Sequence, residues 1–191
     1  KIALEMQGLT ATRSHAGFHS LDVVIEAVFE NMEAKKKELS ELESAISNEA
    51  LIGSNTSSCS ITELATALKN PGRFVGMHFF NPAPRMPLVE IVPGEKTSPH
   101  AVVRAVELAR SLGKVPVVVK DCAGFLVNRI LIPYLNEACL LLEDGFEVAQ
   151  VDRTLRSFGL PMGPFELIDE IGVDITCQAA LMLERAYGSR M

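Results

Sequence analysis

Two acid–base side chains stand alone within apolar segments of this sequence. Glu90 interrupts the run Leu88–Val92, and His78 is the one ionisable residue of Phe74–Phe80. A carboxylate in a central strand loses hydration unless it is paired, so each residue would gain from lying beside the other. A carboxylate on one imidazole nitrogen fixes the tautomer and strengthens the other nitrogen as a general base. We predict a His78–Glu90 pair; a solvated edge strand and a satisfied core histidine are the alternatives.

Two further polar signals accompany this pair. The cluster Ser54–Ser58 follows a predicted strand, and ligands of open α/β sheets bind beyond the carboxyl ends of strands. Helix capping is the alternative interpretation, but Ser60 already has the spacing of a cap, which leaves Ser57 available. Asn128 lies among apolar residues near the start of a predicted helix, where a buried amide needs a partner such as a ligand oxygen.

The other histidines, the lysine run and the cysteines lack such a setting. His15, His19 and His100 lie in polar or first-turn positions, and Lys35–Lys37 has the pattern of a solvated helix face. The four cysteines are far apart without a Cys-x-x-Cys pair, which favours free buried thiols in a reducing compartment. We therefore expect no metal site. The sequence also contains no phosphate-binding loop, nucleophile elbow or Gly-x-Gly-x-x-Gly motif.

The composition is that of a globular protein with a sizeable core. The chain has 191 residues, 48% hydrophobic and 22% charged, with a formal net charge of −6. This acidic balance, with no basic stretch among aromatics, argues against nucleic-acid binding. No apolar run approaches the roughly 20 residues that span a bilayer, so we expect no membrane span.

A sheet is needed to bring the candidate residues together, and strand and helix patterns alternate up to residue 121. Continuous apolar strands between helices imply a mainly parallel sheet covered on both faces. Helices are expected at 32–46, from the capping box at Ser60 to about Leu68, and from the cap at Ser98 to about Leu112. The strands are expected at residues 22–28, 50–54, 74–80, 88–92 and 115–120.

Beyond residue 121 the pattern is helical throughout. The first helix is expected to end at Gly145, with Pro133 as a potential bend. The predicted fold class is therefore α/β, a Rossmann-type mainly parallel sheet followed by an all-helical domain, with the boundary near residues 122–124. The helices are expected at residues 125–144, 148–158, 165–171 and 175–187.

Six short sequence motifs occur in a fixed order along the chain. Together they resemble the 3-hydroxyacyl-CoA dehydrogenase family of fatty-acid β-oxidation, over about residues 17–174. The sequence of Arg85–Ile91 is most similar to that of the dehydrogenase portion of bacterial multifunctional enzymes. Those enzymes carry an enoyl-CoA hydratase domain upstream. The six motifs are Ile25–Asn31, Ser54–Ser58, Gly76–Pro82, Leu88–Val92, Gly124–Arg129 and Pro161–Pro164.

The resemblance implies roles for individual residues and a reaction. His78 would take the proton of the 3-hydroxyl as hydride leaves C3 of an (S)-3-hydroxyacyl-CoA for NAD, giving the 3-ketoacyl-CoA. Glu90 would orient His78, while Ser57 and Asn128 would hold the substrate oxygen. Contacts to the NAD cofactor are implied for Ala27, Glu30, Lys35, Ser57 and Asn81.

Two other kinds of protein are alternatives to this enzyme. Another β-hydroxyacid dehydrogenase is disfavoured by the His78–Glu90 pair, because that class uses a lysine base. A non-catalytic, crystallin-like relative is disfavoured because Ser57, His78, Glu90 and Asn128 are all present.

The resemblance also implies how the chain is divided. Residues 1–122 would be the C-terminal part of an NAD-binding Rossmann-like domain whose first βαβ unit, with its glycine-rich turn, precedes Lys1. Residues 123–191 would be a helical domain that is not necessarily complete. We therefore expect this piece alone to bind NAD weakly and to be inactive. The whole protein is expected to be cytoplasmic, and either a homodimer or part of a larger multifunctional complex.

Overall fold

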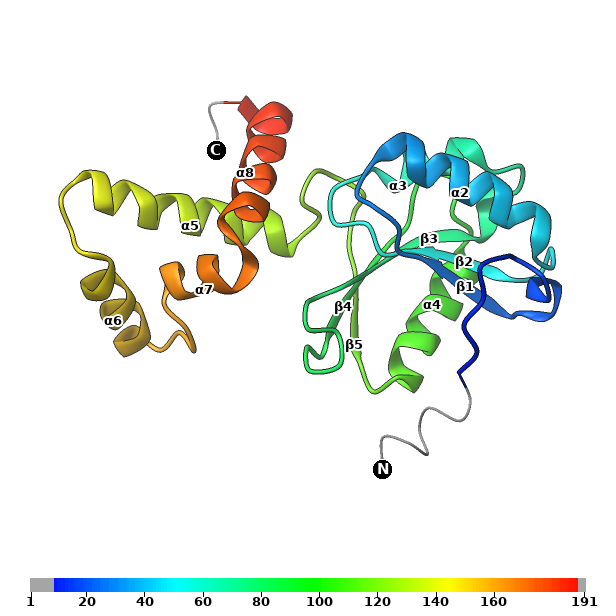
Figure 1. The fold of residues 1–191 in the computed structure, drawn as a ribbon, viewed down its shortest axis with the longest axis horizontal. Helices are drawn as coiled ribbons and strands as arrows, with labels where there is room; N and C mark the ends of the chain where they lie inside the picture. The colour runs from blue at the N-terminus through cyan, green and yellow to red at the C-terminus, as the bar shows by residue number, and fades with distance from the viewer. Residues whose placement is uncertain (1–8, 189–191) are drawn as a thin grey trace.

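A five-stranded sheet forms the centre of the first part of the chain (Figure 1). The structure is a computed structural model and describes residues 9–188. The strand order is β1-β2-β3-β4-β5, and neighbours are parallel except β3 and β4, which are antiparallel. The strands are β1 Val23–Glu26, β2 Leu51–Ser54, β3 Phe74–Phe79, β4 Leu88–Val92 and β5 Val115–Val118.

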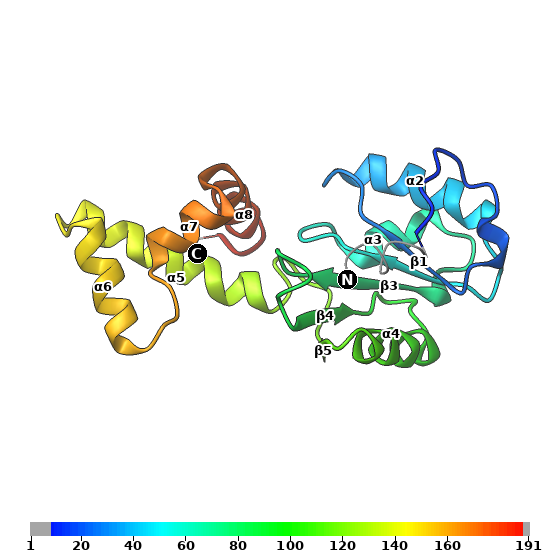
Figure 2. The ribbon, with the colours of Figure 1, turned by 60° about the horizontal axis from the view of Figure 1, so that its bottom comes forward.

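Helices cover both faces of this sheet. Figure 2 shows α2 and α3 on one side of the strands and α4 on the opposite side. A polar side chain begins each of these helices, since Asn31, Ser60 and Ser98 each accept a hydrogen bond from a backbone N–H three residues on. The helices are α2 Met32–Ala45, α3 Ile61–Leu64 and α4 Pro99–Ser111, with short 3-10 turns η2 Phe18–Ser20, η3 Ala65–Ala67 and η4 Pro71–Arg73.

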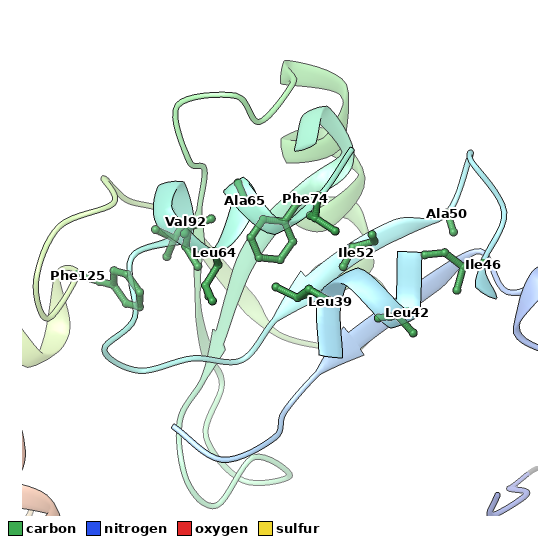
Figure 3. Close-up of a cluster of buried hydrophobic side chains, with 12 residues drawn as sticks. Leu39, Leu42, Ile46, Ala50, Ile52, Leu64, Ala65, Phe74, Val92 and Phe125 are labelled. Carbon is green, nitrogen blue, oxygen red and sulfur yellow. The ribbon is translucent and has the colours of Figure 1, made fainter. Parts of the chain in front are cut away.

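An apolar core lies on each face of the sheet. On the α2 and α3 side, Leu39 and Phe74 are fully buried members of a cluster of buried hydrophobic side chains (Figure 3). On the α4 side, the alanines Ala101, Ala105 and Ala109 recur at helical spacing and pack against the strands. Because the central strands are covered on both faces, they form continuous apolar runs, and a charged residue within one of them is conspicuous.

Gly76 of β3 lies at a point of close packing. A Cβ atom there would lie 2.8 Å from both Ile61 Cδ1 and Val92 Cβ, and both side chains are fully buried. We expect Gly76→Ala to lower the free energy of unfolding by about 1–3 kcal/mol, because the overpacked core must shift. Chemical denaturation measures the change. Gly72→Ala is the matched control, since its nearest neighbour would lie at 3.5 Å; equal stability of the two variants would contradict this expectation.

The second part of the described chain consists of helices packed around their own core (Figure 1). Ile132, Leu135, Ile168 and Leu183 form its buried centre. Within residues 9–188, no helix combines the length and apolar content needed to cross a bilayer. The helices are α5 Val127–Glu143, which contains Pro133, α6 Val148–Phe158, α7 Pro164–Ile171 and α8 Val173–Tyr187.

The predicted architecture is confirmed, with three differences in helix length. The last helix, α8, begins at Val173 rather than at Ile175. The helix that follows Ser60 ends at Leu64 and continues only as the 3-10 turn η3. The first helix of the second part begins at Val127 rather than at Phe125, because Phe125 has a left-handed φ of 46°.

Two side-chain expectations are corrected. All four cysteines are free, as predicted, but Cys139 and Cys177 are exposed instead of buried. His15 is half-buried instead of fully solvated, and its Nε2 lies 3.1 Å from a carboxylate oxygen of Glu38.

Candidate active site

The antiparallel pairing of β3 and β4 places His78 directly opposite Glu90. Imidazole Nδ1 lies 2.7 Å from Glu90 Oε2, and the two side chains are 5% and 0% exposed. An ionised carboxylate accepts hydrogen bonds only, so Nδ1 carries the hydrogen and donates it to Glu90. In the neutral form of the ring Nε2 then carries the lone pair, and Nε2 has no hydrogen-bond partner among the described residues. The predicted pair is confirmed as a contact, with one nitrogen left available as a base.

The second oxygen of Glu90 binds the start of the helical part. Glu90 Oε1 accepts hydrogen bonds from the backbone N–H groups of Leu126 and Val127, both at 2.9 Å. These amides lie at the N-terminus of α5, where the helix dipole favours a negative charge. Burial alone would raise the pKa of the Glu90 carboxyl, but hydrogen bonds from His78, Val127 and Leu126 outweigh burial and hold that pKa below its ordinary value. Glu90 is therefore ionised.

Aromatic rings enclose the imidazole of His78. The ring of Phe80 lies 4.5 Å from it between centroids, and the ring of Phe125 lies at 5.7 Å, edge-on. Such a setting restrains rotation of the imidazole and shields its contact with Glu90 from water.

A second carboxylate organises the polar loop after β2. Glu30 Oε1 accepts hydrogen bonds from the Thr56 hydroxyl, the Ser57 N–H, and both the N–H and the hydroxyl of Ser58. Burial raises the pKa of Glu30, but these hydrogen bonds and the charge of Lys35 outweigh burial and lower it overall. Glu30 thereby fixes the backbone of this loop, while Ser57 itself is exposed.

Lys35 lies in a buried charge cluster, and its predicted place on a solvated helix face is wrong. Its side chain is 1% exposed, and Nζ lies 2.9 Å from Glu26 Oε1, 3.1 Å from the Val28 carbonyl and 3.3 Å from Glu30 Oε2. Glu26 is also fully buried and accepts hydrogen bonds from the Ser54 hydroxyl and the Val28 N–H. Two hydrogen bonds and two neighbouring carboxylates therefore compensate the buried cation.

Acid should destabilise the protein through these carboxylates. Both Glu30 and Glu90 have a pKa below that of the unfolded chain, so their contribution to stability is full above about pH 4.3 and is lost as pH falls through the lower folded values. We expect the free energy of unfolding to fall less steeply below pH 4.3 in Glu30→Gln than in the unsubstituted protein. Urea denaturation at several pH values measures the slope. Glu33→Gln, at an exposed position, should keep the original slope; a Glu30→Gln slope equal to that control would contradict the expectation.

The remaining predicted residues follow β1 and β3 or lie at the start of α5, and no hydrogen bond in the described part of the chain joins their side chains to His78 or Glu90. Asn128 is half-buried in the first turn of α5, next to Val127, and its amide has no partner among the described residues. Ala27 lies just beyond β1 and Asn81 just beyond β3, both exposed. These positions leave the polar groups of Asn128 and Asn81 available to a ligand.

Sequence reasoning missed several groups. One is Glu26, although it is a charged residue in an apolar strand, which is the signal that identifies Glu90. The amides that bind Glu90 carry no sequence signal, because any residue type has an N–H group. Asp121 accepts hydrogen bonds from the Ser60 hydroxyl and two N–H groups of α3. These bonds anchor the segment between β5 and α5 to the start of α3.

This arrangement suits proton transfer to or from an oxygen held near His78 Nε2. A buried, oriented imidazole with a free nitrogen is a general base, and exposed hydroxyl and amide groups nearby can orient an oxygen. Among residues 9–188, no cluster of three or more His, Cys, Asp or Glu side chains could hold a metal ion.

Comparison with known proteins places this chain within a family of dehydrogenases. Residues 1–122 match the family described as 3-hydroxyacyl-CoA dehydrogenase, NAD binding domain, and residues 124–191 match the 3-hydroxyacyl-CoA dehydrogenase C-terminal domain. The chain therefore belongs to the 3-hydroxyacyl-CoA dehydrogenase family, as its six sequence motifs predict.

Three individual relatives show how similar the chain is to known proteins and how much of each it covers. The "fatty acid oxidation complex subunit alpha" of Psychrobacter arcticus is 47% identical over 191 residues, which cover 100% of this chain and 27% of that protein. The chain thus spans about a quarter of the length of this curated relative. Among solved structures, (S)-3-hydroxybutyryl-CoA dehydrogenase from Ralstonia eutropha superposes with a TM-score of 0.89 at 39% identity, covering 93% of this chain and 64% of that one. The 3-hydroxybutyryl-CoA dehydrogenase of Escherichia coli gives 0.87 at 42% identity, covering 93% and 38%.

Proposed function

We propose that this chain carries the proton-transfer site for reversible oxidation of (S)-3-hydroxyacyl-CoA to 3-ketoacyl-CoA in fatty-acid β-oxidation. The supporting observation is the buried His78–Glu90 pair with its free Nε2. In the oxidative direction Nε2 takes the proton of the 3-hydroxyl, and Glu90 offsets the positive charge that forms on the imidazole. In the reductive direction the same nitrogen returns the proton to the oxygen on C3.

Ser57 and Asn128 are proposed to hold the substrate oxygen. The backbone N–H of Ser57 donates a hydrogen bond to the Glu30 carboxylate, which fixes the loop that carries Ser57. Asn128 is the residue directly after Val127, whose backbone N–H binds Glu90. Both side chains therefore come from segments whose backbone is tied to the charged groups of the site. Such preorganised donors stabilise charge on an oxygen better than mobile ones.

The proposed cofactor is NAD, which when bound accepts hydride from C3. The residues present suit it, because the carboxyl ends of β1 and β2 offer the Ala27 backbone, Glu30 and Ser57 at exposed positions. Lys35 Nζ already faces three protein acceptors, so we assign it to holding Glu30 and the backbone at Val28. Asn81 is proposed as a further polar contact.

A spectrophotometric assay of the full-length protein with acetoacetyl-CoA and NADH tests this function. The proposal expects loss of NADH absorbance that depends on the thioester substrate. Reduction of free acetoacetate but not of the CoA thioester would favour another β-hydroxyacid dehydrogenase. No turnover of either compound would favour a non-catalytic relative.

We further propose a division near residue 122 into a part of the NAD-binding domain and a helical domain. The two stretches that match family domains, 1–122 and 124–191, support it. Residues 1–191 contain no Gly-x-Gly-x-x-Gly motif, the turn on which a cofactor pyrophosphate is bound. We expect residues 1–191 alone to bind NAD weakly or not at all. Isothermal titration measures this, and low-micromolar binding would contradict it.

The protein is proposed to act in the cytoplasm on acyl-CoA thioesters, as a homodimer or within a multifunctional complex. The description of the Psychrobacter relative as a subunit of a fatty acid oxidation complex supports the complex. Four free cysteines suit a reducing compartment. Size-exclusion chromatography with light scattering on the full-length protein tests the assembly, and a monomer would contradict it.

A further inference from the structure

Phe125 has a backbone conformation that its residue type disfavours. Its φ is 46°, and it is the one non-glycine residue with a positive φ among residues 9–188. A left-handed conformation crowds the Cβ of an L-residue and persists only where the surrounding structure imposes it. Gly124, directly before it, is also left-handed with a φ of 72°. The chain therefore turns twice in the left-handed sense between the sheet and α5.

This turn directs the two N–H groups that follow it. The amides of Leu126 and Val127 both point to Glu90 Oε1 at 2.9 Å. The Leu126 side chain gives α5 no cap, so the carboxylate of β4 takes that role from outside the helix. The φ angle of Phe125 is a rotation about its N–Cα bond, so it sets the direction of the backbone that follows. An ordinary right-handed φ at Phe125 would therefore turn the N–H groups of Leu126 and Val127 away from Glu90.

The Phe125 side chain reaches the other member of the pair. Its ring lies edge-on to the His78 imidazole at 5.7 Å, and the residue is 3% exposed. In Figure 3 it lies at the end of the buried cluster, apart from most of the other labelled side chains. One residue thus contacts His78 through its ring and controls Glu90 through its backbone.

The helical part holds the turn in place. A Cβ atom on Gly124 would lie 2.8 Å from Leu183 Cδ2, and Leu183 of α8 is fully buried. The Ala123 carbonyl accepts a hydrogen bond from the Tyr187 hydroxyl at 3.1 Å. Packing of α8 against residues 123–124 therefore supports the strained conformation at Phe125.

We propose that Phe125 is a positioning residue for the His78–Glu90 pair. Its left-handed backbone aims the α5 amides at Glu90, and its ring fixes the imidazole. This inference rests on the proposed dehydrogenase function. The competing explanation is simple core packing, because Phe125 also belongs to the apolar cluster.

The two explanations predict opposite rankings of two variants of the full-length protein. Phe125→Gly removes the ring but adopts the left-handed backbone freely, whereas Phe125→Val keeps apolar bulk but resists that backbone. Positioning predicts that kcat falls from the unsubstituted protein to Gly and then by a further factor of about 10–100 to Val, with KM for NADH unchanged. Packing predicts that Val is the more active and more stable variant. Phe158→Val, at an exposed position, is the matched control and should leave kcat unchanged.

A second readout is independent of turnover. Since the α5 amides help to lower the pKa of Glu90, loss of stability below about pH 4.3 should be shallower in Phe125→Val than in Phe125→Gly. Equal slopes, or a kcat for Val equal to or above that for Gly, would overturn the inference. No turnover by the unsubstituted protein would overturn the proposed function instead, while the stability slopes would still decide whether Phe125 aims the amides.

Discussion

Replacing His78 with glutamine should lower kcat by about 10²–10⁴-fold, the range that a positioned general base contributes. The glutamine amide can still donate a hydrogen bond to Glu90, which keeps the buried carboxylate satisfied. It cannot take up the proton of an alcohol, so the loss falls on the chemical step. Steady-state kinetics of the full-length protein with acetoacetyl-CoA and NADH measures the effect, and KM for NADH should change little.

The matched control for this variant is His100→Gln. His100 is exposed in the first turn of α4, and its side chain makes no hydrogen bond, ion pair or ring contact within residues 9–188. The control should retain the kcat of the unsubstituted protein. A His78→Gln enzyme that kept its kcat within a few-fold would mean that another group takes the proton.

Replacing Glu90 with glutamine should also lower kcat by about 10²–10⁴-fold, although the shape of the side chain is preserved. Both Glu90 oxygens accept hydrogen bonds, one from His78 and one from the α5 amides. Glutamine has one acceptor oxygen and one donor nitrogen, so it cannot satisfy both sides. If the oxygen stays with the α5 amides, its NH₂ group donates to Nδ1. The hydrogen of the imidazole then moves to Nε2, and the base is lost.

Glu90→Ala separates the catalytic effect from the structural one. Alanine leaves His78 Nδ1 and the two amides unpaired in a site that excludes water, so we expect the free energy of unfolding to fall by about 3–5 kcal/mol. Thermal or urea denaturation measures this loss. Glu95→Gln, at an exposed position just after β4, is the control and should match the unsubstituted protein in both stability and kcat. A Glu90→Gln enzyme with normal turnover would contradict the role of the carboxylate.

Much of the fold could be predicted from the sequence because local signals agreed with the overall architecture. Apolar strands alternating with helices imply a sheet covered on both faces, and caps such as Ser60 and Ser98 mark helix starts. The pairing of His78 with Glu90 was predictable for a related reason. In strands that are otherwise apolar, a single charged residue needs a partner, and the two strands are close in sequence.

The rest could not be predicted because it depends on tertiary contacts. Lys35 has the same local pattern as its exposed neighbour Lys37, and only the carboxylates of Glu26 and Glu30 make its burial possible. The cap of α5 is supplied by a residue about 36 positions earlier in the chain. The left-handed backbone of Phe125 has no marker in its residue type, which ordinarily disfavours it.

The most direct measurement of the central claim is a crystal structure of the full-length protein with acetoacetyl-CoA and NAD. We predict that the oxygen on C3 lies within about 2.6–3.2 Å of His78 Nε2, with Nδ1 still bound to Glu90. An oxygen bound elsewhere, with His78 turned away from the substrate, would contradict it.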